Sequence, residues 1–198
     1  MTKIRNEVAS ATRTTWISNF NAESNNIYDD FNTNEIVLTK TIYEKLMLDY
    51  SCHIRIYFGL NASGGTVAIA LPAYKLDELD SESMDRQWDN IYRDGYIYDL
   101  YKESTMTIAE AQSYITNWNA NSSDELFLKG FIIPRSNLID IFENQDQDYC
   151  LIDFGLKKEI KLMTQACTSG GTPLANPVVG DKAVPCPPVC SYIEFLDL

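Results

Sequence analysis

The residues whose spacing is most distinctive for chemistry are two cysteines near the C-terminus, Cys186 and Cys190, which enclose Pro-Pro-Val. Two thiolates at this spacing can hold zinc when two further ligands join them from elsewhere in the chain. A short disulfide or redox pair is a second interpretation, although the usual redox motif has only two residues between its cysteines. A structural role in a stiff turn is a third, and we favour it. We therefore predict no cofactor, with zinc at Cys186 and Cys190 as the alternative.

His53 is the only histidine, which excludes His-rich metal sites and catalysis that needs two imidazoles. Arg55 and Tyr57 follow it in a predicted strand, and Asp153 lies in the equivalent strand of a second repeat described below. One hypothesis is that these four side chains converge on a ligand site between the two repeats. The alternative, which we favour, is that His53 is a structural residue whose hydrogen bonds are satisfied.

Aromatic side chains gather in the segment that joins the two repeats. An acidic run opens this segment at residue 77, and tryptophan and tyrosine residues follow it. Such side chains combine a large contact area with a polar group, so they suit a ligand pocket or a protein interface. Packing in the core is the alternative interpretation, and we expect it for most of them. The candidates for a ligand or interface role are Trp88, Tyr92, Tyr96 and Tyr98.

An acidic pattern, with Asn144, Asp146 and Asp148 at alternate positions, resembles the opening of a calcium-binding loop. The pattern is incomplete, because Tyr149 stands where such a loop requires glycine. We therefore predict a solvated loop here rather than a metal site.

The charge of the chain limits its partners. Its 198 residues include 16 Lys and Arg against 28 Asp and Glu, a formal net charge of -12. Such a surface repels phosphate backbones and anionic membranes, so nucleic acid is not an expected partner. No apolar stretch approaches the ~18 residues of a membrane-spanning helix, and the N-terminus lacks the apolar run of a secretion signal. Together with an odd number of cysteines, these features predict a soluble cytoplasmic protein with reduced thiols and no membrane insertion.

An internal repeat is the main indication of the fold. Residues 36–60 align without a gap onto residues 132–156, and both blocks end in Ile-x-Phe-Gly-Leu. Upstream, residues 17–22 (ISNFNA) resemble residues 115–120 (ITNWNA). Chance rarely produces two such matches in the same order, so we predict two diverged copies of one unit.

Each copy predicts the same series of elements. A first helix is expected at residues 6–20 in one copy, and after a Thr-x-x-Glu capping box at Thr107 in the other. A short extended stretch and a second helix follow, with Thr39 or Thr41 and Ser136 as candidate N-caps. A strand with alternating apolar residues then turns back as a β-hairpin in both copies.

These elements predict an α+β protein in which two diverged helix–helix–β-hairpin repeats surround an antiparallel sheet, with the helices packed on one face. The expected boundaries are residues 1–76 for the first repeat, 77–105 for the connecting segment and 106–166 for the second repeat. Residues 167–198 form a tail rich in Gly, Pro and Cys, which we expect to be irregular. All four parts are expected to share one compact domain.

The RIYFGL strand, its hairpin and the C-terminal CPPVC resemble an uncharacterised family of small bacterial cytoplasmic proteins. The resemblance covers about half of the chain. It implies a small bacterial cytoplasmic protein, and it brings no activity, ligand or catalytic residue to this sequence.

The functional prediction follows from motifs that are missing as well as from those that are present. The sequence contains no phosphate-binding loop and no nucleophile elbow. The duplicated architecture and the aromatic segment therefore favour a non-enzymatic interaction or assembly role, with a protein partner or a second copy of the chain. A small-ligand-binding protein or an enzyme with a site between the repeats is the first alternative. A thiol or zinc protein that uses Cys186 and Cys190 is the second.

Overall fold

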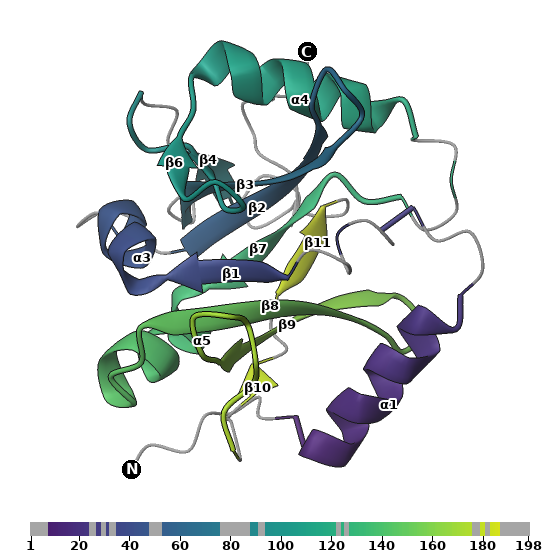
Figure 1. Cartoon of the computed structure of the whole chain (residues 1–198), viewed down its shortest axis with the longest axis vertical. Coiled ribbons are helices and arrows are strands. Elements are labelled where there is room, and N and C mark those ends of the chain that lie inside the picture. Colours follow the sequence, from purple (N-terminus) through teal and green to yellow (C-terminus); the bar gives the residue numbers. More distant parts are fainter. Residues whose placement is uncertain are drawn as a thin grey trace.

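The structure is a computed structural model, and it combines helices with antiparallel sheets. It describes residues 8–23, 27–28, 31, 35–47, 53–75, 88–90, 94–121, 124, 127–175, 179–180 and 183–186. In these residues the strands form two antiparallel sheets, and helices lie on both sides of the pair (Figure 1). The predicted α+β class is confirmed.

The first half of the chain supplies a helix, a short strand, a second helix and a hairpin. These elements are α1 (Ser10–Asn21), β1 (Ile36–Thr39), α3 (Lys40–Leu46), β2 (His53–Leu60) and β3 (Thr66–Lys75). The hairpin turn is held by Asn61, whose Oδ1 accepts hydrogen bonds from the backbone N–H groups of Ser63 and Gly65. The predicted hairpin is confirmed.

The second half has the same order of elements. They are α4 (Ile108–Asn119), β7 (Gly130–Pro134), α5 (Arg135–Ile139), the π-helix η2 (Asp140–Asn144), β8 (Tyr149–Leu156) and β9 (Ile160–Ala166). The predicted capping box is confirmed, because Thr107 and Glu110 each accept a hydrogen bond from the backbone N–H of the other. Thr39, one of the two N-caps expected for the second helix of the first half, is the N-cap of α3. The expected N-cap Ser136 is wrong, because Pro134 is the N-cap of α5.

Strands also occur in the connecting segment and in the tail. The connecting segment contributes β4 (Trp88–Asn90), β5 (Tyr98–Asp99) and β6 (Ser104–Thr105), and the tail contributes β10 (Val179–Gly180) and β11 (Val184–Cys186). The expectation of an irregular tail is therefore wrong in its described part. The reason is that β9 and β7 would otherwise leave a row of unpaired backbone groups at a sheet edge, and β10 and β11 pair with them.

The strand order shows that the two halves exchange partners. In one sheet, with the order β1-β8-β9-β10, β1 of the first half pairs with β8 of the second. In the other sheet, with the order β11-β7-β2-β3-β5-β6 and β4 beside β3, β7 of the second half pairs with β2 of the first. The helices follow the same exchange, since α1 packs on β8 and α4 packs on β2. Each half therefore completes the sheet of the other.

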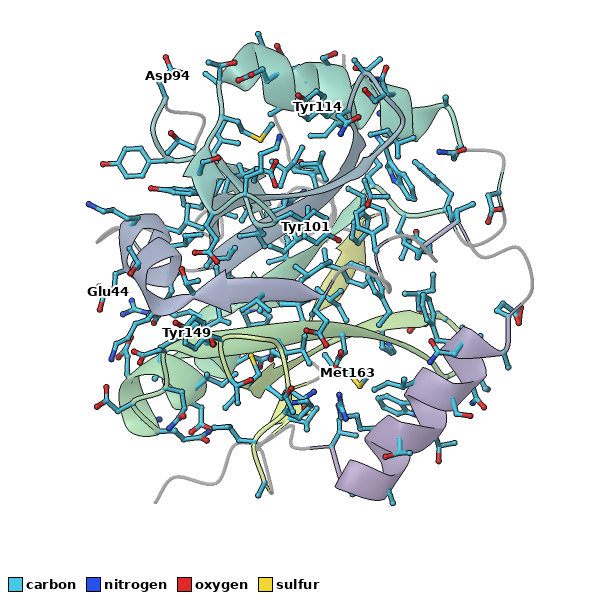
Figure 2. All side chains as sticks on the ribbon, in the orientation of Figure 1. Glu44, Asp94, Tyr101, Tyr114, Tyr149 and Met163 are labelled. Atoms are coloured by element: carbon cyan, nitrogen blue, oxygen red, sulfur yellow. The ribbon has the colours of Figure 1, made fainter. Side chains whose placement is uncertain are left out.

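The two sheets pack face to face, and helices cover their outer faces. The core between the sheets contains residues of both hairpins, such as Phe58 and Phe154. Figure 1 shows α4 over the β2 sheet at the top and α1 under the β8 sheet at the bottom, and Met163, labelled in Figure 2, packs between the β8 sheet and α1. We expected one sheet with helices on one face. Two sheets form because the hairpin strands are buried on both faces, so each sheet needs a helix on one side and a second sheet on the other.

The register of the two halves differs by one residue from the ungapped alignment. Ile36 pairs with Ile152 on β8, whereas the residue that pairs with Ile56 on β2 is Phe131. The structural equivalent of Ile36 is therefore Phe131, one residue before the aligned Ile132. The second half must then contain one extra residue before β8.

The π-helix η2 lies in the stretch that contains this extra residue. The backbone N–H of Gln145 donates to the carbonyl oxygen of Asp140, five residues earlier, at 3.0 Å. A π-turn holds one residue more than an α-turn, so η2 accommodates the extra residue without moving β8. π-helices are rare, and they are frequent at functional sites.

The interface of α4 with β2 and that of α1 with β8, here called the outer interfaces, contain equivalent hydrogen bonds. The side-chain amide of Asn117 on α4 donates to the carbonyl oxygen of Leu60, at the end of β2, at 3.0 Å. The side-chain amide of Asn19 on α1 donates to the carbonyl oxygen of Leu156, at the end of β8, at 3.3 Å. Each helix is thus tied to the hairpin of the other half in the same way.

Close glycine contacts match in the same manner. A Cβ on Gly59 would lie 2.9 Å from the Cβ of Tyr114, which is labelled on α4 in Figure 2, and a Cβ on Gly155 would lie 2.9 Å from the Cβ of Trp16 on α1. Both helices therefore approach the backbone of β2 or β8 at a residue without a side chain. These matched contacts support the internal repeat, which stays a prediction.

Candidate functional site

A cavity lies between the two sheets, beside α3. Its volume is about 330 Å³, at the small end of the range for ligand sites. Its lining comes from α3 with its N-cap, from the connecting segment and from the start of β8, where Figure 2 labels Tyr149. The lining residues are Thr39, Lys40, Thr41, Ile42, Lys45, Tyr98, Glu103, Asp148 and Tyr149. The cavity is thus formed where both halves of the chain meet.

The floor of the cavity is buried, and its rim is charged. Thr39, Ile42 and Tyr98 are the buried residues of the lining. Lys40 and Tyr149 are half-buried. Exposed residues complete the lining, and they are Thr41, Lys45, Glu103 and Asp148. A molecule that enters would therefore meet hydroxyl and apolar groups inside and charges of both signs at the mouth.

The end of β1 positions one wall of the cavity. Thr39 pairs with Tyr149 of β8, and its Oγ1 accepts a hydrogen bond from the backbone N–H of Ile42 at 3.3 Å, so the strand passes directly into α3. The next N–H, that of Lys40, donates to the carbonyl oxygen of Asp148 at 2.8 Å. These bonds attach α3 of the first half to the start of β8 in the second half.

An ion pair closes the same side of the cavity. The Nζ of Lys40 lies 2.6 Å from Oδ1 of Asp146. This hydrogen bond raises the pKa of Lys40, and it lowers the pKa of Asp146. Both groups are therefore charged at neutral pH. Asp146 belongs to the acidic loop that we predicted to be solvated, and it is exposed.

The backbone near the cavity contains two left-handed residues. In the described part of the chain, the non-glycine residues with positive φ are Glu103 and Asp146, each with a φ of 51°. Glu103 lines the cavity, and Asp146 binds Lys40 in its wall. This conformation is unfavourable for residues with a side chain, and it is concentrated at functional sites in proteins.

Contacts between α3 and η2 join the two helices beside this wall. The ring of Tyr43 stacks on Phe142 with centroids 4.5 Å apart, and the Tyr43 hydroxyl donates to Oε1 of Glu143 at 2.5 Å. Burial raises the pKa of Tyr43, and the bond to Glu143 adds to the effect. The phenol therefore stays protonated, and it keeps the two helices together at neutral pH.

The structure does not bring the four predicted site residues together. His53, Arg55 and Tyr57 lie at alternate positions of β2, and Tyr57 packs with the residues of α4 on the outer face of the β2 sheet. The Arg55 Nη1 lies 3.4 Å from the Tyr57 hydroxyl. Asp153 lies in the β8 sheet and binds Arg13 of α1. The predicted convergence fails because equivalent positions of the two hairpins point to opposite outer faces of the molecule.

Asp153 forms a polar cluster of its own beneath α1. Its carboxylate accepts hydrogen bonds from Arg13 and from the Nε2 of Gln165, the latter at 2.6 Å. Burial raises the pKa of Asp153, and the bonds to Arg13 and Gln165 oppose this shift. The cluster ties α1 to the sheet.

Of the four aromatic candidates, Tyr98 lies at the cavity. Tyr96 is half-buried. Trp88 is on β4, opposite Lys75, and Tyr92 lies outside the described residues. The connecting segment thus contributes a sheet edge and part of the cavity, while the interface role of its aromatic residues stays a prediction.

The cysteines do not form a recognisable reactive site in the described part of the chain. Cys186 is in β11 and pairs with Gly130, and Cys190 lies outside the described residues, so the zinc hypothesis stays a prediction. Among described residues, no group of His, Cys, Asp and Glu is arranged to hold a metal ion. Burial raises the pKa of Cys150 and that of Cys167, the latter to about 11. Both thiols are therefore protonated at neutral pH and poorly nucleophilic.

Sequence reasoning missed most of the cavity lining. Lys40 and Lys45 carry no local signal, because charged residues on a short helix are typical of a solvated face. Glu103 is recognisable only through its left-handed backbone, which the sequence does not reveal. Asp148 belonged to a noted acidic pattern, but we assigned that pattern to solvent.

Two further findings bear on the kind of protein. In the ranges that the structure describes, no helix is long and apolar enough to cross a membrane. Comparisons with family models, with curated proteins and with solved structures found no match to this chain. The predicted resemblance, the cytoplasmic location and the interaction or assembly role stay predictions.

Proposed function

We propose that this protein binds a small zwitterionic molecule in the cavity beside α3. The observation that carries the proposal is the composition of the lining, in which a buried floor lies beneath charges of both signs. This location agrees with the first alternative from the sequence, a ligand site between the two repeats. The residues differ from the predicted ones, with Tyr98 as the shared residue.

The charge balance of the cavity supports a dipolar ligand. Two lysines, Lys40 and Lys45, and two acidic residues, Glu103 and Asp148, line the cavity, and because Lys40 is paired with Asp146, Lys45 is the lysine that would meet a carboxylate of the ligand. In the whole chain, by contrast, 28 acidic residues face 16 basic ones. An anion would meet the acidic residues of the rim and a cation the lysines, whereas a molecule with both charges can satisfy each.

The size and the buried floor restrict the ligand further. A cavity of about 330 Å³ suits a molecule of the size of a free amino acid or a dipeptide. Thr39 and Tyr98 offer hydroxyl groups on the floor, and Ile42 offers apolar contact. The left-handed backbone at Glu103 supports a functional role, because it places a carboxylate on the rim at a conformational cost.

The test is a titration of the full chain, labelled with nitrogen-15, with single probe molecules. Glutamine and alanine serve as zwitterionic probes, and succinate and putrescine serve as probes with one sign of charge. We expect a zwitterionic probe to shift the backbone amide signals of residues 39–42 and 148–149 in a saturable manner. Succinate and putrescine should bind more weakly. If no zwitterionic probe shifts these signals, or if succinate binds best, the proposal is wrong.

Charge-removing variants give the same test a matched control. Lys45→Gln and Glu103→Gln each remove one rim charge, and each should weaken binding of the best probe by roughly 3- to 10-fold. Lys158→Gln makes the same lysine change at an exposed residue of the β8–β9 turn and should leave binding unchanged. Equal affinities for all three variants would contradict the assignment of the rim.

A further inference from the structure

The place that corresponds to the cavity floor in the other half of the chain holds a different set of residues. Tyr98 of β5 pairs with Ala70 of β3, and Gly180 of β10 pairs with Thr164 of β9. The hairpins β2–β3 and β8–β9 occupy equivalent positions in the two sheets. Gly180 therefore stands where the first half has Tyr98, and Thr164 stands where it has Ala70.

The short helices complete this correspondence. Ile42 is the third residue of α3, and Asn137 is the third residue of α5. In the first half, Ile42, Ala70 and Tyr98 all belong to the apolar core. In the second half, polar Asn137 and Thr164 replace the two apolar residues, and Gly180 replaces the aromatic one.

The two polar side chains are buried and lie beside the same glycine, Gly180. Asn137 is 3% exposed and Thr164 is 0% exposed. A Cβ on Gly180 would lie 2.7 Å from the Nδ2 of Asn137 and 2.8 Å from the Oγ1 of Thr164, so both groups lie beside this glycine. Any side chain at residue 180 would displace them.

Within the described residues, the hydrogen-bonding groups of this pair have no protein partner. Nδ2 and Oδ1 of Asn137 and Oγ1 of Thr164 are buried and form no hydrogen bond in the described part of the chain. An amide and a hydroxyl together offer several donors and acceptors, and leaving them unsatisfied in the interior is costly. Native proteins rarely retain such groups without a partner.

We propose that Asn137 and Thr164 form a site for a buried water molecule beside Gly180. Water supplies two donors and two acceptors, which match an amide and a hydroxyl that are buried side by side at one glycine. A larger ligand is disfavoured by the near-complete burial of both residues. An ion is disfavoured because neither side chain carries a charge that would compensate it. The water links α5 to the β9–β10 edge, and the site is independent of the zwitterion cavity.

The proposal is tested by magnetisation transfer from water to the side-chain amide protons of Asn137, in the full chain labelled with nitrogen-15. We expect a direct cross-peak with the sign of a long-lived bound water. An Asn137 amide group that shows contacts with protein protons and none with water would overturn the proposal.

Variants at Thr164 sharpen this measurement. Thr164→Val removes the hydroxyl while it keeps the shape, and we expect the water cross-peak of Asn137 to be lost, whereas Thr164→Ser should retain it. Thr15→Val makes the same change at an exposed threonine of α1, whose hydroxyl donates to the carbonyl oxygen of Ala11 at 3.0 Å, and should leave the cross-peak unchanged. A cross-peak that survives in Thr164→Val excludes Thr164 from the site. If that variant does not fold, the wild-type spectrum still decides.

Discussion

The interface of α4 with β2 and that of α1 with β8 can be compared with two equivalent strand pairs, β3 with β5 and β9 with β10. At both interfaces an asparagine near the helix end binds the last carbonyl of a strand, and a glycine lies directly under the helix. In these strand pairs, by contrast, Tyr98 of β5 is matched by Gly180 of β10, and in the short helices Ile42 of α3 is matched by Asn137 of α5.

This difference shows that the two kinds of contact have different structural requirements. The outer interfaces hold each helix on the hairpin of the other half, so the same small residue and the same polar residue are needed twice. The β3–β5 and β9–β10 pairs have no such shared requirement, and only the first of them is known to border the cavity, through Tyr98. The asymmetry therefore marks the part of the molecule where a ligand site could develop without loss of the common frame.

The largest effect is expected where α4 and α1 each place an aromatic side chain in the core between the sheets, and it tests whether the two helices contribute equally to that core. Trp118 on α4 and Phe20 on α1 are each 1% exposed, and Phe20 stacks on Phe154 while Trp118 packs against Phe58. We expect Trp118→Ala and Phe20→Ala each to lower the free energy of unfolding by about 3–5 kcal/mol, measured by urea denaturation. A loss below about 1 kcal/mol for one of them would break the comparison, because that helix would then contribute little.

A smaller effect is expected at the two glycines. Gly59→Ala would place a methyl group 2.9 Å from the Cβ of Tyr114 and should cost about 1–3 kcal/mol of stability. Gly155→Ala meets the flexible end of Met163 at 2.8 Å as well as the Cβ of Trp16, so we expect a cost of the same sign and similar size.

The control for the glycine variants is Gly170→Ala, since nothing lies within 4 Å of the Cβ position at Gly170. Its urea midpoint should stay close to that of the wild type. A Gly59→Ala variant as stable as Gly170→Ala would show that α4 can move away from β2 at no cost, which would contradict the tight contact described above.

The smallest expected effect is on the pH dependence of stability, and it concerns the interface of α1 alone. Asp153 lies beneath α1, whereas the equivalent residue beneath α4 is Tyr57. Burial raises the pKa of Asp153, so the folded protein binds this proton more tightly than the unfolded chain does. The contribution of Asp153 to stability is therefore most favourable below its unfolded pKa and declines as pH rises through its folded pKa. The stability of the wild type minus that of Asp153→Asn, followed by urea denaturation across this range, should decrease with rising pH. A difference that increases with pH would mean that the bond to Arg13 outweighs burial.

Local features of this fold were predictable from the sequence because they depend on neighbouring residues. Thr107 and Glu110 predicted the start of α4, and the apolar alternation after His53 predicted β2. Asn61 and the glycines after it predicted a turn. In each case the physical cause, a cap, a pleat or a left-handed turn residue, lies within a few positions of its effect.

The exchange between the halves was not predictable, and neither was the cavity. The two aligned segments have the same apolar pattern, and this pattern does not specify that β1 pairs with β8 of the second half. The cavity lining combines Lys40, Glu103 and Asp148, which are far apart in the sequence and look like solvated surface when read singly. The predicted convergence of Arg55 and Asp153 failed for the same reason, because the pairing of distant strands determined which outer face each residue occupies.

The exchange also determines the order in which the molecule can be assembled during synthesis. When β1 and β2 leave the ribosome, their partners β8 and β7 do not yet exist, so the first half exposes apolar strand edges until translation nears the C-terminus. Long segments of chain separate β1 from β8 and β2 from β7, so these pairs form slowly. Strand edges that stay unpaired in the meantime can pair with strands of other chains. The first half can form its β2–β3 hairpin alone, whereas the pairs of β1 with β8 and of β2 with β7 form only after the second half has been made.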